Sequence, residues 1–163
     1  MFLRRGIEAA WLAASRQFPV VLLTGPRQVG KTTLLERLRA RGRTYVSLDD
    51  PTVRALAQED AALFFQRFEP PVLIDEIQYA PGLLPVMKTI VDKTRKPGMI
   101  WLTGSQQFQV MRGVSETLAG RVASSTSSAS PGASAIASNW PCRRFSPRRR
   151  HWRRGCGRTR RHG

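Results

Sequence analysis

Short apolar runs alternate along the chain with stretches in which apolar residues recur every three or four positions. The runs lie near residues 18–24, 43–48, 71–76 and 98–103. Their length and continuity are typical of β-strands buried on both faces, and the periodic stretches between them predict helices. One such helix is expected at the start of the chain, where Leu3, Ile7, Trp11 and Ala14 share a face. The alternation predicts an α/β fold with a parallel sheet.

A glycine-containing segment, Gly25–Thr33, follows the first predicted strand and fits the pattern G-x-x-x-x-G-K-[ST]. In such a loop the backbone N–H groups surround the β-phosphate of a nucleotide, a lysine reaches the β- and γ-phosphate oxygens, and a hydroxyl ligates Mg²⁺. Lys31 and Thr32 occupy these two positions. The predicted nucleotide-binding residues are Gly25, Pro26, Arg27, Gln28, Val29, Gly30, Lys31, Thr32 and Thr33.

Two adjacent carboxylates, Asp75 and Glu76, end the third predicted strand. With a phosphate loop upstream, Asp75 is expected to hold Mg²⁺ through its water shell. Glu76 is expected to polarise the water that attacks the γ-phosphate. A solvated acidic strand end is the alternative, but the loop favours a functional site. The adjacent glutamate favours hydrolysis over binding alone.

Small polar residues follow the fourth predicted strand, in the segment 104–107. Ligands of a doubly wound sheet collect at the carboxyl ends of its strands. Ser105 or Gln106 is therefore a candidate sensor of the γ-phosphate, although a simple helix N-cap by Ser105 explains the pattern equally well. The aspartate pair Asp49 and Asp50 is interpreted as a turn or cap rather than as a second metal site.

Three segments together, 25–33, 72–78 and 102–106, resemble the AAA-type P-loop ATPases of prokaryotes. The amino-acid sequences of residues 102–106 and 115–122 are most similar to those of the family in which an AAA domain precedes a C-terminal domain of unknown function. The resemblance covers about residues 1–122. It implies a three-layer P-loop sandwich, the cofactors ATP and Mg²⁺, and an arginine, Arg121, that contacts the γ-phosphate in cis or from a neighbouring subunit.

The composition changes after Val122, where residues 123–138 are almost entirely Ser, Ala, Thr, Pro and Gly, and residues 143–161 contain ten arginines. The other 17 Lys and Arg residues stand against 11 acids, so the body carries only +6 of the formal net charge of +16. We expect two parts, an ATPase domain over 1–122 and a disordered tail over 123–163.

Three interpretations of the tail remain open. A basic arm could neutralise nucleic-acid phosphates, with Trp140 and Trp152 as stacking surfaces. The arginines could instead follow from GC-rich codons. The third, favoured hypothesis is that one base is missing from the encoding DNA after about Val122. Reading from one base earlier turns TCN serines into Leu, Ile, Val or Phe and CGN arginines into Ala, Pro, Ser or Thr, which restores an ordinary composition.

Under the frame hypothesis, the fifth strand that the resemblance implies near Arg121 is expected to be missing, together with any helical lid. The strand before the phosphate loop would then be an exposed apolar edge.

The prediction is an Mg²⁺-dependent ATPase domain, truncated and poorly active. Lys31, Glu76, Ser105 and Arg121 are expected to serve catalysis, and Thr32 and Asp75 are expected to bind the metal. The alternatives are a nucleic-acid-binding protein and a nucleotide-binding scaffold without turnover. We also expect a homo-oligomer. No apolar stretch approaches the roughly 18 to 20 residues of a membrane span, which favours a cytoplasmic protein.

Overall fold

The computed structural model describes residues 2–26, 30–39, 42–104, 113–114 and 116–126, and its centre is one sheet of five parallel strands. The strands are β1 Val20–Thr24, β2 Thr44–Ser47, β3 Val72–Asp75, β4 Ile100–Gly104 and β5 Val122–Thr126. Their order across the sheet is β2-β3-β4-β1-β5. The predicted parallel sheet is confirmed, and the four strands predicted from apolar runs differ from the observed ones by at most a few residues at either end.

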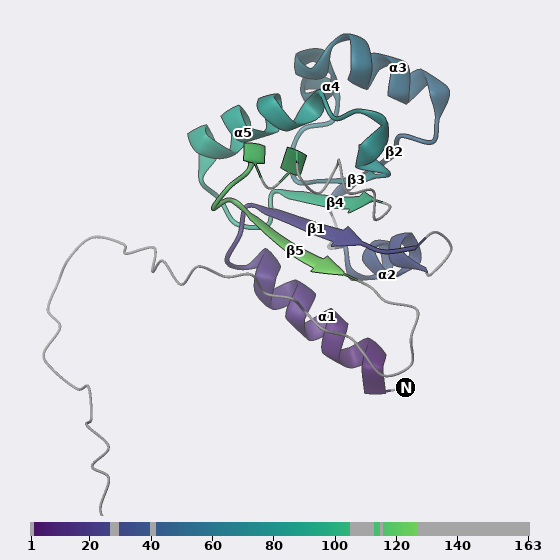
Figure 1. The fold of residues 1–163 in the computed structure, drawn as a ribbon, viewed down its shortest axis with the longest axis vertical. Helices are drawn as coiled ribbons and strands as arrows, with labels where there is room; N and C mark the ends of the chain where they lie inside the picture. The colour runs from purple at the N-terminus through teal and green to yellow at the C-terminus, as the bar shows by residue number, and fades with distance from the viewer. Residues whose placement is uncertain (1, 27–29, 40–41, 105–112, 115, 127–163) are drawn as a thin grey trace, which may run out of the picture.

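Helices cover both faces of the sheet (Figure 1). The helical elements are α1 Phe2–Ser15, α2 Lys31–Leu38, α3 Pro51–Glu59, α4 Ala61–Arg67, the 3₁₀ turn η1 Ile77–Tyr79 and α5 Leu83–Thr94. Helices α1 and α2 lie on one side, while α3, α4 and α5 lie on the other. The described residues therefore form the three layers of the predicted sandwich.

Two apolar clusters, one on each face of the sheet, form the core. Alternate residues of β1 enter different clusters: Val20 and Leu22 face α3, α4 and α5, whereas Val21 and Leu23 face α1 and α2. All four side chains are buried, which explains why β1 is a continuous apolar run rather than an alternating one.

The fifth strand is present, so the expectation that it is missing is wrong. β5 pairs in parallel with β1, with Val122 opposite Val20 and Thr126 opposite Thr24. It begins at Val122, where the composition changes, and continues through Ala123 and two serines. A strand at the edge of a sheet needs backbone hydrogen bonds on one side only, so a polar segment can supply it. β1 is consequently an interior strand.

Aspartate side chains begin two of the helices. The carboxylate of Asp50 accepts hydrogen bonds from the backbone N–H groups of Thr52 and Val53, which confirms the predicted capping role for Asp50. Asp60 caps α4 by accepting from the N–H of Leu63 and thereby separates α4 from α3. Within the described part of the chain, no helix has both the length and the apolarity to cross a membrane.

Candidate nucleotide-binding site

The phosphate-loop segment connects the carboxyl end of β1 to the start of α2. Gly25 follows β1 and is buried, Pro26 is exposed, and Gly30 precedes the first residue of α2. Gly30 has φ +76°, in the left-handed region that side chains rarely adopt, so the turn requires glycine there. The predicted residues Arg27, Gln28 and Val29 lie outside the described residues.

Lys31, the first residue of α2, is buried, with 6% of its surface exposed. Its ammonium donates to the carbonyl oxygens of Gly25 at 3.0 Å and of Pro26 at 2.7 Å. In the described part of the chain it forms no ion pair. A buried cation is costly unless a negative charge compensates it, so the site favours an anion beside the free N–H groups at the start of α2.

Asp75, at the end of β3, receives hydrogen bonds from hydroxyl groups of three different elements. Thr32 of α2 donates to Oδ1 and Oδ2, at 3.1 and 2.9 Å, and Tyr45 of β2 donates to Oδ2 at 3.1 Å. Thr103 of β4 donates to Oδ1. The carboxylate is 5% exposed. The structure thus joins Thr32, the residue after Lys31, to Asp75, although the sequence placed them in two separate motifs.

Glu76 follows Asp75 in a left-handed backbone conformation, with φ +59° and ψ +49°. This conformation is strained for a residue with a side chain, typically by about 1–3 kcal/mol. The N–H of Glu76 donates to the Thr103 hydroxyl at 3.2 Å, and its carboxylate accepts from the side-chain amide of Gln78. The turn places Glu76 at the carboxyl edge of the sheet, as predicted, with its carboxylate bonded to Gln78.

Sequence reasoning missed Tyr45 and Thr103. Both lie in apolar runs and point polar atoms at Asp75, a relation that depends on strand register rather than on any local motif. Burial, followed by the charge of Asp75 and the hydrogen bond to it, raises the pKa of Tyr45 to about 12. Tyr45 therefore keeps its proton at neutral pH and remains a donor.

The other predicted site residues do not take part in the hydrogen bonds around Asp75 and Glu76 that the structure describes. Thr33 is exposed on the first turn of α2, and Ser105 and Gln106 lie outside the described residues. Arg121 immediately precedes β5, at the amino edge of the sheet, about 16 Å from the carboxyl edge by the length of a five-residue strand. A contact with a nucleotide bound by a neighbouring subunit stays a prediction for Arg121.

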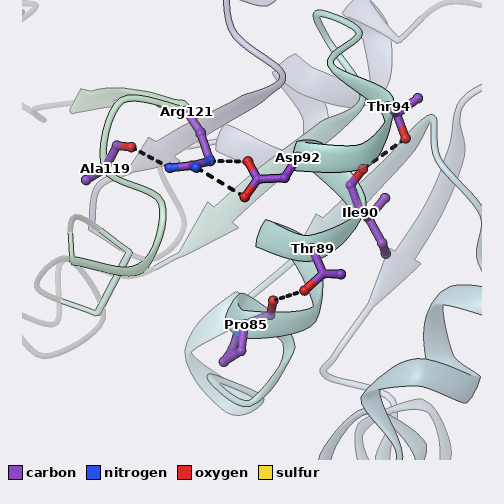
Figure 2. Close-up of polar contacts among 7 residues, drawn as sticks. All are labelled: Pro85, Thr89, Ile90, Asp92, Thr94, Ala119 and Arg121. Carbon is purple, nitrogen blue, oxygen red and sulfur yellow. Dashed lines mark hydrogen bonds and ion pairs between the residues drawn. The ribbon is translucent and has the colours of Figure 1, made fainter.

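In this chain Arg121 binds an acid of α5 (Figure 2). Its Nε and Nη2 donate to the two carboxylate oxygens of Asp92 at 2.5 and 3.1 Å, and Nη1 donates to the Ala119 carbonyl at 3.0 Å. This hydrogen bond, more than the nearby charges, lowers the pKa of Asp92. The pair joins the residue before β5 to α5.

The side-chain atoms that could ligate a metal at the carboxyl edge of the sheet suit a hard divalent cation. They are oxygen atoms, the carboxylate of Asp75 and the hydroxyl of Thr32, which Mg²⁺ prefers. Because Thr32 gives its proton to Asp75, its lone pairs are free to face a ligand. No group of three or more His, Cys, Asp or Glu residues that could hold a metal occurs among the described residues. Mg²⁺ here would need further oxygen ligands from water and phosphate, as is usual for this ion.

Sequence comparisons relate this chain to known proteins. The sequence model of a family described as AAA domain matches residues 17–128. An uncharacterized protein of Mycobacterium bovis and another of Mycobacterium tuberculosis are each 38% identical over 120 residues, which are 73% of this chain and 27% of each relative. The chain thus spans about a quarter of the length of these relatives.

Among solved structures, the fold is similar to that of a DNA replication initiation factor, at 18% identity and a TM-score of 0.47, over 74% of this chain and 44% of that one. The family match begins just after α1 and extends through the phosphate loop and the two carboxylates to β5. The chain belongs to the AAA domain family, whose members are P-loop ATPases.

Proposed function

We propose that this chain binds ATP with Mg²⁺ at the carboxyl edge of its sheet and hydrolyses it. The observation that carries the proposal is the hydrogen bond of the Thr32 hydroxyl to both oxygens of Asp75, at 3.1 and 2.9 Å. This contact joins the phosphate loop to a carboxylate 43 residues later in the chain, and Thr32 directly follows the buried Lys31.

Each residue has a distinct role in the proposed site. Lys31 would exchange its bonds to the carbonyls of Gly25 and Pro26 for phosphate oxygens, and the N–H groups at the start of α2 would bind the same anion. Thr32 and Asp75 would hold Mg²⁺, the latter through water. When bound, this ion neutralises the charge that develops on the phosphate oxygens.

Glu76 is the proposed general base. Its backbone N–H is fixed by Thr103, which orients the strained turn. Its carboxylate is bonded to the amide of Gln78, so a water molecule must replace or join that amide before Glu76 can accept a proton. The same bond favours a second candidate function, a scaffold that binds nucleotide without turning it over.

The test is binding of a fluorescent ATP analogue to the full chain, followed by phosphate release. Lys31→Ala should weaken binding by about a hundredfold or more, because it removes charge-assisted hydrogen bonds to phosphate. Lys96→Ala, which removes an exposed lysine, is the matched control and should bind as the native chain does. Equal binding by the native chain and Lys31→Ala would refute the proposed site.

Glu76→Gln separates the enzyme from the scaffold. Under the hydrolysis proposal it retains nucleotide binding and lowers phosphate release by at least about a hundredfold, within the usual range for a general base. If the native chain binds nucleotide but, like Glu76→Gln, releases no phosphate above the protein-free background, the scaffold is the better description.

The tail interpretations and the truncation proposal concern residues beyond Thr126, which lie outside the described residues. Sequencing the encoding DNA from the Arg121 codon onward and translating all frames distinguishes an open shifted frame from a true arginine arm. If the arm is genuine, polynucleotide binding that weakens steeply with salt and is removed by deleting residues 143–163 supports nucleic-acid binding. Mass measurement in solution tests the proposed homo-oligomer.

A further inference from the structure

Tyr45, on the outer strand β2, contacts both the carboxylate of Asp75 and the apolar cluster beneath α2. In the sheet register Tyr45 lies opposite Leu73 and Ser47 lies opposite Asp75, so Tyr45 must reach along the strand to bring its hydroxyl 3.1 Å from Oδ2 of Asp75. Its ring is packed against the apolar cluster beneath α2, which includes Leu35. The guanidinium of Arg39, at the end of α2, is 6.0 Å from the ring centroid.

Tyr45 and Thr103 approach Asp75 from the neighbouring strands on either side of β3, β2 and β4. Tyr45 donates to Oδ2 and Thr103 to Oδ1, so each oxygen has one fixed donor from the sheet. Thr32, the third donor, belongs to the loop and helix that would contact the nucleotide. The two donors from the sheet can therefore orient the carboxylate while Thr32 responds to the ligand.

We propose that Tyr45 is a positioning residue that sets the Mg²⁺ affinity of this site by holding the plane of the Asp75 carboxylate. The inference rests on the proposed function, because it assigns Asp75 to Mg²⁺. Mg²⁺ demands near-ideal octahedral geometry, whereas Ca²⁺ accepts irregular and variable geometry. A carboxylate of Asp75 that is held less firmly, without the Tyr45 bond to Oδ2, should therefore weaken Mg²⁺ binding much more than Ca²⁺ binding.

The experiment measures how much Mg²⁺ or Ca²⁺ is needed for half-maximal binding of the fluorescent ATP analogue to the full chain. Tyr45→Phe keeps the ring and removes only the hydroxyl. Tyr79→Phe, in the other tyrosine of the chain, is the matched control. We expect the Mg²⁺ midpoint of Tyr45→Phe to rise about fivefold, the equivalent of one hydrogen bond, with a change of less than about twofold for Ca²⁺. Tyr79→Phe should leave both midpoints unchanged.

A double-mutant cycle with Asp75→Asn separates positioning from a general structural role. In the Asp75→Asn background, Tyr45→Phe should produce no further change in the Mg²⁺ midpoint, because the two residues act through one contact. An unchanged or lower Mg²⁺ midpoint in Tyr45→Phe, or equal shifts for Mg²⁺ and Ca²⁺, would overturn the inference and leave the proposed function intact. Absence of nucleotide binding by the native chain would instead overturn both.

Discussion

Thr103 offers a direct test of the hydrogen bonds that join Asp75 and Glu76, since its hydroxyl serves both. It accepts from the N–H of Glu76 at 3.2 Å and donates to Oδ1 of Asp75. The residue is 0% exposed, so water cannot easily replace the hydroxyl. Thr103→Val removes the hydroxyl and retains the volume of the side chain.

The expected loss in the free energy of unfolding follows from these two contacts. A buried N–H left without a partner costs about 1–3 kcal/mol, and a lost hydrogen bond to a charged group costs about 1.5–3 kcal/mol. The Glu76 N–H bond is only partly buried, which places the first cost near its lower limit. Asp75 still accepts from Thr32 and Tyr45, which does the same for the second. We expect a total loss of about 3 kcal/mol, a large part of the ordinary stability of about 5–15 kcal/mol.

Urea unfolding of the full chain, followed by circular dichroism, measures this loss. The control is Thr103→Ser, which keeps both hydrogen bonds, removes one methyl group and should cost about 1 kcal/mol. The two variants should have equal m-values if only stability changes. A valine variant as stable as the native chain, or a serine variant that loses as much as valine, would refute the reasoning.

Two further predictions concern contacts outside the site. Arg43→Met removes a guanidinium that donates to the Gly98 carbonyl at 2.6 Å and lies 4.1 Å from the ring centroid of Trp101, so urea unfolding should show a loss of about 2 kcal/mol. Equal midpoints for this variant and the native chain would contradict it. The hydrogen bond from Arg121 lowers the pKa of Asp92 below 3.8, so its stabilising effect is present above that pH and is lost as the pH falls through the lower folded value. The native chain should therefore melt above Asp92→Asn at neutral pH, and a gap that persists in strong acid would exclude this cause.

Much of the architecture could be predicted from the sequence, because strands buried on both faces leave continuous apolar runs. β1 is such a run, and the glycines and Lys31 after it form a local motif whose chemistry depends on spacing alone. The proximity of Thr32 to Asp75 was also predictable in outline, since the carboxyl ends of parallel strands meet at one edge of the sheet.

The contacts that the sequence did not reveal depend on which residues of neighbouring strands lie opposite one another, or on one polar side chain in an apolar strand. The approach of Tyr45 to Asp75 requires knowing which residues of β2 and β3 are opposite one another. β5 was wrongly expected to be missing because its serines give no apolar signal, although pairing with β1 requires only its backbone. The position of Arg121 relative to the loop similarly depends on where β5 begins.

The central position of β1 also has a consequence for the order of folding. Val20 pairs with Ile100 on one side and with Val122 on the other, so both neighbours of the loop-bearing strand come from late in the chain. Contacts of such high contact order form slowly, because a long loop must close before any pairing compensates its entropy. A nascent chain therefore completes the carboxyl edge of its sheet in one late step, after Thr126 has been made. If ATP binds as proposed, ATP present during refolding would stabilise the finished sheet without accelerating its assembly.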